Sequence, residues 1–328
     1  MDTKLLFDFF ETELEKFRKE NSRNQPLELY VPISYILQLG GKKLRPLLVL
    51  MACDLVDGKK EDAIHAALAI EVFHNFTLMH DDIMDNAPIR RGKATVHEQW
   101  NNNIAILSGD AMLVKAYQEL FKLDPTIQQK VLEIFSKTAL EVCEGQQLDM
   151  NFETLQNVSI PMYINMIGLK TAVLLGASLQ IGALVGGATM EDAKALYDFG
   201  KNIGIAFQLQ DDILDVYGNE ENFGKKKGGD IIANKKTYLI LKTLEIADRY
   251  SKEELLTWLG HPTKKEDETE KVTAVTKILD FYSIRELAKK EMDFYYQKGL
   301  KAIENLPCAQ EKKQTLLNFA SQLMVREI

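Results

Sequence analysis

The sequence predicts an all-α protein, built as one large helical bundle around a central cavity. Apolar residues recur at spacings of three and four through almost every segment of the 328-residue chain, which is the period of a helix with one buried face. No run alternates β-branched and polar residues as a half-buried strand would. Apolar residues make up 46% of the chain, which is ample for a large core. No shift of composition marks a boundary, so residues 1–328 are predicted to form a single domain.

The predicted helices follow one another with short interruptions. The first occupies residues 2–20, and a loop and a helix start lie between Pro26 and Pro32. The glycine-rich segment GGKKLRP, Gly40–Pro46, breaks the chain before the next helix. Further helices are expected at residues 47–56, 62–80, 105–123, 127–142, 161–184, 190–216 and 236–247, and in a tail from residue 252 onward. Loops are expected at residues 86–97 and in the very polar stretch at residues 260–270.

One apolar stretch is long enough to be weighed as a membrane span. It is Thr171–Ala188, TAVLLGASLQIGALVGGA. Ser178 and Gln180 interrupt it, and its many glycines and alanines make it less apolar than its length suggests. A helix that is apolar all round can equally be the buried centre of a large bundle, where small residues let neighbouring helices approach closely. We favour the buried helix and expect no membrane span.

Composition excludes other classes of protein. The net charge of −8 argues against a general nucleic-acid binder. The three cysteines, Cys53, Cys143 and Cys308, have no metal-ligand spacing and are interpreted as reduced thiols. The N-terminal segment is amphipathic and acidic, and it lacks the basic start, long apolar stretch and cleavage site of a signal peptide. The sequence therefore predicts a cytoplasmic protein.

The segment Phe73–Gly92, FHNFTLMHDDIMDNAPIRRG, carries the first cluster of chemically active residues. An apolar helix ends in Asp81, Asp82 and Asp85, and Arg90 and Arg91 follow. Asp81 and Asp85 are one turn apart on one face, where their charges repel unless a cation lies between them. Mg²⁺ suits two carboxylates and a phosphate, and an arginine fork suits the same phosphate. The alternative is a solvated acidic helix end.

A second cluster of the same form lies further along the chain. QLQDDILD carries Asp211, Asp212 and Asp215 on a helical pattern, with Gln208 one turn before Asp212. Lysines at positions 225, 226, 227, 235 and 236 follow among glycines. Two acidic clusters, each followed by cations, suggest one site built from two facing helices of a bundle.

Other cations complete the set. Lys42 and Arg45 lie in GGKKLRP, and Lys170 opens the apolar stretch. Glycine beside a cation lets the backbone approach a bulky anion. Four lysines are instead interpreted as solvated surface side chains: Lys43, Lys226, Lys227 and Lys236.

Taken together, these motifs resemble the trans-isoprenyl diphosphate synthases, the polyprenyl synthetases that make geranyl, farnesyl, geranylgeranyl and longer diphosphates. The resemblance rests on GGKKLRP, HNFTLMHDDIMDNAPIRRG, EGQQLDM, LKTA, FQLQDDILD and GKKKGGDIIANKKT, in the family's order from about Gly40 to Tyr238. It implies the all-α isoprenoid synthase fold. It also implies condensation of isopentenyl diphosphate with an allylic diphosphate, which would be dimethylallyl, geranyl or farnesyl diphosphate, in a homodimer.

The resemblance also implies a role for each site residue. About three Mg²⁺ ions are expected at Asp81, Asp85 and Asp211, with Asp82, Asp212 and Asp215 completing the clusters by direct or water-mediated contact. The allylic diphosphate is expected to contact Arg90, Lys170, Lys225 and Lys235. Isopentenyl diphosphate is expected to contact Lys42, Arg45, His74 and Arg91. Thr171 and Gln208 would stabilise positive charge beside the reacting carbons, and Gln146 would line the site.

The resemblance further implies that product length depends on the residues four and five positions before the first cluster, which are Thr77 and Phe76 here. Phe76, with no insertion inside DDIMD, resembles the geranylgeranyl-type pattern, so C20 is favoured and C15 is next; Phe76 as an ordinary core residue is the alternative. Three rival functions stay open, of which a phosphohydrolase is the weakest because the sequence has no nucleotide-binding glycine loop. A terpene cyclase should lack GGKKLRP, and a non-catalytic regulatory subunit should have lost some of the six aspartates.

Overall fold

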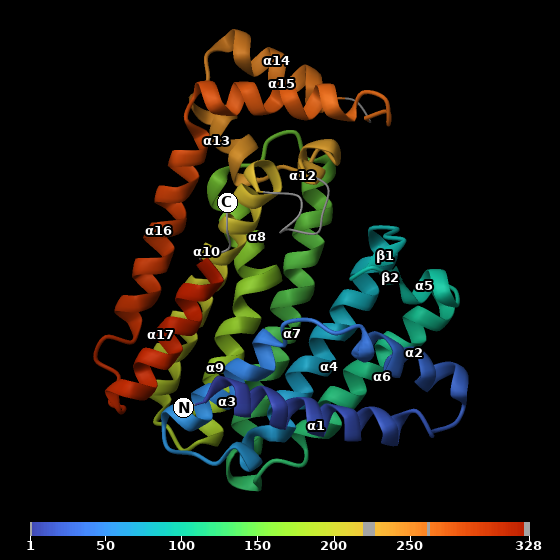
Figure 1. Cartoon of the computed structure of the whole chain (residues 1–328), viewed down its shortest axis with the longest axis vertical. Coiled ribbons are helices and arrows are strands. Elements are labelled where there is room, and N and C mark those ends of the chain that lie inside the picture. Colours follow the sequence, from blue (N-terminus) through green and yellow to red (C-terminus); the bar gives the residue numbers. More distant parts are fainter. Residues whose placement is uncertain (1, 219–226, 261–262, 325–328) are drawn as a thin grey trace. The chain divides into compact units, whose positions relative to one another are not determined.

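The computed structural model describes residues 2–218, 227–260 and 263–324, and this part of the chain is almost entirely helical (Figure 1). The predicted all-α class is therefore confirmed. The helices are α1 (Thr3–Asn21), α2 (Leu27–Gln38), α3 (Leu44–Leu55), α4 (Lys60–Met84), α5 (Val96–Gln99), α6 (Asn102–Leu120), α7 (Pro125–Thr154), α8 (Ile160–Ile167), α9 (Val173–Val185), α10 (Met190–Tyr217), α12 (Gly229–Ile232), α13 (Tyr238–Ile246), α14 (Arg249–Leu259), α15 (Glu268–Phe281), α16 (Ile284–Ala302) and α17 (Gln310–Met324). A π-helical turn, η1 (Gly168–Ala172), joins α8 to α9.

Contacts divide the chain into two compact units, which are described separately. Unit 1 comprises Met1–Lys137, Ala177–Tyr197 and Leu306–Gln314, and unit 2 comprises Thr138–Gly176, Asp198–Asn305 and Thr315–Ile328.

In unit 1, α4 is the central helix. It packs against α3 and, most extensively, against α6 (Figure 1). Phe73 and Met79 of α4 are almost fully enclosed. Close approach between helices depends on glycine, which has no side chain. A Cβ added at Gly182 of α9 would lie 2.0 Å from the carbonyl oxygen of Val49 in α3. Only glycine permits that approach, because no real Cβ comes so near another heavy atom.

In unit 2, the core gathers around α8, α10, α13, α15 and the start of α16. Leu209 and Ile213 of α10 are completely buried there, as are Leu239 of α13 and Leu279 of α15. A Cβ at Gly204 of α10 would meet the backbone of Ala172 at 2.7 Å, so small residues again decide how closely two helices pack.

The apolar stretch that was weighed as a membrane span belongs to the described helical run Ile160–Val185. This run is long and apolar enough to cross a membrane by length and composition alone, but 83% of its most apolar window is buried inside the protein. The burial supports the interpretation as a core helix.

The predicted loop at residues 86–97 contains a small hairpin that the sequence did not reveal. Strands β1 (Ile89–Arg90) and β2 (Lys93–Ala94) pair antiparallel, with Ile89 opposite Ala94. The two residues between them, Arg91 (φ 53°) and Gly92 (φ 74°), are both left-handed, as a tight hairpin with two central residues of positive φ requires. Two-residue strands are too short to leave an alternating pattern.

Candidate active site

The first acidic cluster lies at the C-terminal end of α4, in unit 1. Asp81 and Asp82 are in the last turn, and Asp85 is the residue that follows the helix, with its N–H donating to the carbonyl of Asp81 at 2.9 Å. Asp85 is exposed and Asp81 is half-buried. A helix C-terminus carries partial negative charge, so carboxylates are placed there against the helix dipole. The position therefore strengthens the preference for a bound cation.

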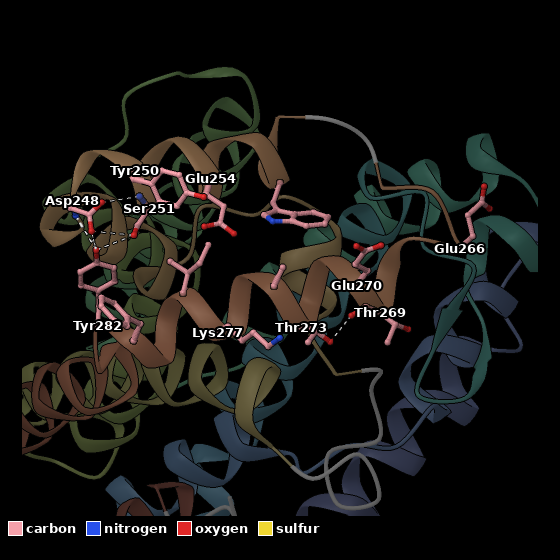
Figure 2. Close-up of a pocket in the computed structure, with 14 residues that line it drawn as sticks. Asp248, Tyr250, Ser251, Glu254, Glu266, Thr269, Glu270, Thr273, Lys277 and Tyr282 are labelled. Carbon is pink, nitrogen blue, oxygen red and sulfur yellow. Dashed lines mark hydrogen bonds between the residues drawn. The ribbon is translucent and has the colours of Figure 1, made fainter.

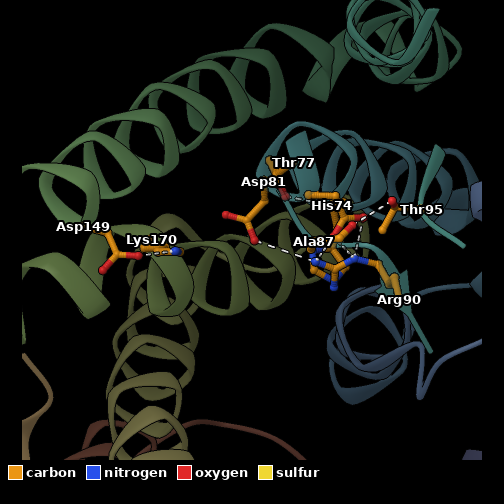
Figure 3. Close-up of polar contacts among 9 residues, drawn as sticks. His74, Thr77, Asp81, Ala87, Arg90, Thr95, Asp149 and Lys170 are labelled. Carbon is orange, nitrogen blue, oxygen red and sulfur yellow. Dashed lines mark hydrogen bonds and ion pairs between the residues drawn. The ribbon is translucent and has the colours of Figure 1, made fainter. Parts of the chain in front are cut away.

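Asp82 holds Arg90 in place. The Arg90 Nε atom donates to both Asp82 oxygens at 2.8 Å, and Nη2 lies 2.7 Å from Oδ1. Nη2 is also 3.8 Å from Asp81 Oδ2, the ion pair drawn in Figure 3. Burial raises the pKa of Asp82 and the Arg90 bonds oppose that effect, with a net rise. Asp82 is thus a buried carboxylate whose bonds fix an arginine beside Asp81.

The GGKKLRP turn is attached to α4 by a buried ion pair. Lys43, in the left-handed conformation (φ 47°), donates from Nζ to Glu71 Oε1 at 2.9 Å, and the Asn75 amide donates to the same oxygen at 2.9 Å. The Lys43 and Glu71 side chains are 2% and 3% exposed. The interpretation of Lys43 as a solvated surface residue is therefore wrong. A turn with three positive-φ residues brings the ammonium group inward, which the residue type alone does not reveal.

Two further contacts shape this turn. Arg45 Nη1 lies 3.1 Å from His74 Nε2. Because a guanidinium group only donates, Nε2 must accept and the His74 proton is on Nδ1. Burial and the neighbouring arginines hold the pKa of His74 well below 6.5, and burial lowers the pKa of Arg45 to about 10. The pair therefore presents one positive charge and a neutral imidazole.

The Arg91 side chain reaches the same turn. Its guanidinium donates to the carbonyl of Gly40, and a Cβ at Gly41 would lie 2.7 Å from the guanidinium carbon. Lys42, the residue after Gly41 in the chain, is exposed. All four residues predicted to bind isopentenyl diphosphate therefore belong to unit 1, and contacts place Arg45 beside His74 and Arg91 against the glycine turn that precedes Lys42.

The second acidic cluster lies on α10, in unit 2, and its three aspartates are in different environments. Asp211 is half-buried, whereas Asp212 and Asp215 are buried. Asp212 Oδ2 accepts from the Tyr163 hydroxyl at 2.6 Å and from the Tyr238 N–H at 3.2 Å. Burial raises the pKa of Asp212 to about 8. Asp215 Oδ2 accepts from the Asp230 N–H at 3.1 Å. These bonds connect α10 to α8, α12 and α13.

Lys170 and Thr171 lie in the π-helical turn η1, a kind of bulge found often at functional sites. A Cβ at Gly145 of α7 would lie 2.2 Å from the backbone nitrogen of Lys170, so α7 approaches the backbone of this turn very closely. The Lys170 Nζ atom is 2.5 Å from Asp149 Oδ2. This ion pair is drawn in Figure 3. The Thr171 hydroxyl is 3.4 Å from Gln208 Oε1. The structure thus places Lys170, Thr171 and Gln208 together in unit 2.

The remaining predicted residues are placed less fully. Lys235 is exposed, 3.7 Å from Asp230 Oδ1. Gln146 is half-buried on α7. Lys225 and Lys226 lie outside the described residues, and Lys227 is exposed as expected. Lys236 was also interpreted as a solvated surface residue, but its Nζ donates to the carbonyl of Phe152, near the end of α7, and burial lowers its pKa. The Lys236 ammonium group donates to carbonyls in the last turn of α7, which have no hydrogen-bond partner within the helix.

The product-length residues lie on α4, in unit 1. Phe76 is 8% exposed, with its ring centroid 5.7 Å from that of Phe73 and 4.8 Å from that of His80. The Thr77 hydroxyl donates to the carbonyl of His74 at 2.8 Å.

Several partners of the site residues were not singled out from the sequence. They are Glu71, Asn75, Asp149, Tyr163 and Asp230. Asp149 had a visible signal because it belongs to the motif EGQQLDM. For Glu71 the only signal was a charged residue in the apolar run AIEVFHNF. Such a residue needs a partner when it is buried, but the sequence cannot say which.

The donor chemistry fits Mg²⁺. Within the described ranges, no three His, Cys, Asp or Glu side chains form a ready-made metal centre. Mg²⁺ binds through one or two carboxylates, several waters and substrate phosphates, so it does not require a complete protein cage. In unit 1 the carboxylate pair Asp81 and Asp85 matches that donor set. In unit 2, described by itself, the half-buried Asp211 is also a carboxylate of a suitable kind.

A groove of about 910 Å³ lies elsewhere, between α14 and α15 in unit 2 (Figure 2). Trp258, Ala274 and Ile278 line it, with Glu254 and Glu270 among its acidic residues. None of the predicted site residues in the described part of the chain lines this groove, so its size alone is no reason to place the chemistry there.

Comparison with known proteins gives consistent matches. The family model described as polyprenyl synthetase matches residues 26–277. A geranylgeranyl diphosphate synthase of Methanosarcina mazei is 38% identical over 308 residues, covering 92% of this chain and 91% of its own. A crystal structure of a geranylgeranyl pyrophosphate synthase has a TM-score of 0.94 and 46% identity, covering 100% of both chains. A geranylfarnesyl diphosphate synthase of Natronomonas pharaonis is 38% identical over 235 residues, covering 66% of this chain and 69% of its own.

Proposed function

Because the chain belongs to the polyprenyl synthetase family and is an enzyme of the transferase class, we propose that it condenses isopentenyl diphosphate with an allylic diphosphate to make a short all-trans prenyl diphosphate. The single observation that carries this proposal is the arrangement along α4. His74, with Arg45 beside it, and the carboxylate Asp81 lie seven residues apart on this helix, or about 10 Å at a rise of 1.5 Å per residue. One helix therefore supports a cationic pocket and, nearby, a pair of carboxylates.

The two sites suit two different diphosphates. The pocket of Lys42, Arg45 and Arg91 offers positive charge and hydrogen-bond donors, which suits the diphosphate that stays intact. The carboxylates suit a diphosphate bound through metal ions, which is the one that leaves. A terpene cyclase has a single diphosphate to bind, so the cationic pocket favours the synthase.

We assign the leaving diphosphate to both acidic clusters. Mg²⁺ held by Asp81, Asp85 and Asp211, with about three ions per site by family resemblance, would supply positive charge against the leaving group. Arg90, positioned by Asp82, and Lys170, positioned by Asp149, donate to the same anion as the allylic carbon–oxygen bond breaks. Lys225 and Lys235 are assigned to this anion by resemblance. We assign Asp212 and Asp215 to holding α8, α12 and α13, because their hydrogen bonds lead to those helices.

The carbocation that forms must meet the double bond of isopentenyl diphosphate before water does. Thr171 and Gln208 offer uncharged oxygens that stabilise positive charge without reacting. Gln146 is assigned to the wall of the site. The carbon–carbon bond forms between the 1′ and 4 carbons, and one proton is then lost to the released diphosphate. No protein base is assigned.

The experiment that tests this function uses purified protein, Mg²⁺, labelled isopentenyl diphosphate and each allylic starter, with products sized by chromatography. Formation of a labelled prenyl diphosphate is expected. Asp81→Ala and Asp211→Ala should each slow the reaction by orders of magnitude, about the hundredfold or more that a lost electrostatic catalyst costs. Circular dichroism should show an intact helical fold. Turnover near the wild-type rate in either variant would contradict the assignment.

For product length we propose C20, with C15 next. Phe76 is bulky and buried five residues before Asp81, which supports an early stop. Phe76→Ala should lengthen the product, and an unchanged length would leave Phe76 as a core residue only.

We also propose a single-domain, cytoplasmic homodimer. The exposed apolar residues Leu107, Val114 and Phe121 are spaced by seven along α6 and just past its end, and each is more than half exposed, at 60%, 57% and 59%. Such a stripe is typical of a helix that packs against a second copy. Sedimentation of wild type and of Val114→Lys would test this, with dissociation expected in the variant.

A further inference from the structure

His80 connects the product-length residue Phe76 to helix α6. The rings of Phe76 and His80 meet edge to face, with centroids 4.8 Å apart and planes inclined by 65°. His80 Nε2 also lies 3.1 Å from the carbonyl oxygen of Ile106. A carbonyl only accepts, so Nε2 carries the proton and donates. His80 therefore contacts both the backbone of α6 and the Phe76 ring.

Gly109 is what makes this contact sterically allowed. A Cβ at that position would lie 2.2 Å from His80 Nε2, and no real side-chain atom could come so close. A glycine in the middle of a helix such as α6 costs about 1 kcal/mol relative to alanine, so a packing reason is expected. The histidine ring resting on Gly109 supplies that reason.

Phe76 is confined from its other side as well. Phe73 and His80 lie three residues before it and four residues after it, so all three rings share one face of α4. The Phe73 ring is 5.7 Å from Phe76 and 5.2 Å from Phe135, and Phe73 is only 1% exposed. The Phe73 ring has no room to move away from Phe76, because it is buried in the core against Phe135. The His80 side therefore decides whether the Phe76 ring can turn.

We propose that His80, seated on Gly109 and bonded to the Ile106 carbonyl, is a positioning residue that locks the Phe76 ring and thereby limits product length. The inference rests on the proposed function, in which Phe76 stops the growing chain. His80 acts through Phe76 and contributes no chemistry. Product length then depends on a contact between two helices and not only on the size of one side chain.

The test measures product distribution in wild type, His80→Ala, Phe76→Ala and the double variant, with isopentenyl diphosphate and dimethylallyl diphosphate as substrates. His80→Ala should raise the ratio of products longer than C20 to C20 by about two- to tenfold, the range expected when an aromatic contact is lost. The effect should be smaller than that of Phe76→Ala. The double variant should match Phe76→Ala, because His80 has nothing left to position.

His65→Ala is the matched control. His65 is also on α4 and also bonds to α6, through Glu119 Oε2 at 2.8 Å, but it lies fifteen residues from His80. It should leave the product ratio unchanged. An equal change in His65→Ala would show that any loosening of the helix pair suffices, and would overturn the proposal.

Other outcomes are separable. If wild type makes no prenyl diphosphate, the proposed function fails first. If wild type condenses its substrates but His80→Ala keeps the wild-type ratio, only the His80 inference fails. A double variant that exceeds Phe76→Ala also overturns it. Should His80→Ala fail to fold, His80→Leu fills the space without donating to Ile106 and should give the same direction of change.

Discussion

Lys43 and Glu71 form an ion pair that is almost completely enclosed: the Nζ–Oε1 distance is 2.9 Å and the side chains are 2% and 3% exposed. Asn75 donates to the same carboxylate oxygen. The pair links the left-handed turn at Lys43 to the helix that carries His74 and Asp81, so the geometry of the cationic pocket depends on it. A buried charge without a partner is much more costly than a buried pair.

Glu71→Gln should therefore lower the free energy of unfolding by about 3–5 kcal/mol, because it leaves the Lys43 ammonium enclosed and uncompensated. Urea denaturation followed by circular dichroism measures the change. The double variant Lys43→Met with Glu71→Met should recover much of the loss, since no charge is then buried. A single variant within about 0.5 kcal/mol of wild type would show that the pair is not buried in solution.

Asp82→Asn should weaken binding of the allylic diphosphate selectively. It removes the charge that holds Arg90 by contacts of 2.7 and 2.8 Å, and Arg90 then loses its fixed orientation. A charge-assisted bond of this kind corresponds to about a tenfold change in affinity. Steady-state kinetics should show a higher KM for the allylic substrate and a nearly unchanged KM for isopentenyl diphosphate. Asp62→Asn, an exposed position on the same helix, is the control, and equal shifts in both KM values would refute the assignment.

Tyr163→Phe should lower the free energy of unfolding by about 1–3 kcal/mol, because the buried Asp212 loses a hydrogen-bond donor at 2.6 Å. Tyr217→Phe is a matched control, since its hydroxyl donates to Asp280 at 2.9 Å in a more exposed setting. The control should lose less stability. If both variants lost the same free energy of unfolding, burial of the Tyr163–Asp212 hydrogen bond would add nothing to its contribution to stability.

Glu119 should make the protein less stable in acid. Burial raises its pKa, but hydrogen bonds from His65 and Lys122 outweigh burial and the net pKa is lowered. The unfolded chain therefore binds more protons near pH 4 than the folded one, so stability is present above about pH 4.5 and is lost as the pH falls through the folded pKa. Thermal unfolding between pH 3 and 6 should show a weaker pH dependence in Glu119→Gln. If Glu119→Gln showed the same pH dependence of thermal unfolding as wild type, Glu119 would be excluded as a cause of the loss of stability in acid.

The sequence was enough to predict the helices, because their apolar period of three to four residues follows from packing one face of each helix into a core. It also predicted two acidic clusters as metal sites, because metal chemistry permits few side-chain types. The set of residues predicted to bind isopentenyl diphosphate came from the resemblance to the family and stays a prediction. Helix boundaries were predicted less accurately than the helices themselves. The helix predicted at residues 127–142 continues to Thr154, and the helix predicted at residues 161–184 contains a π-helical turn.

Only the tertiary structure decided which charged residues act as anchors. Lys42 and Lys43 are adjacent and identical in type, yet one is exposed and the other is buried on Glu71, because a left-handed turn separates their directions. Likewise Asp211 and Asp212 are adjacent and identical in type and differ only in their position around α10. That position lets Asp212 accept a hydrogen bond from the Tyr163 hydroxyl. Local sequence determines which groups are present and on which face they lie. The partners come from helices distant in the chain, and burial makes the choice of partner energetically decisive.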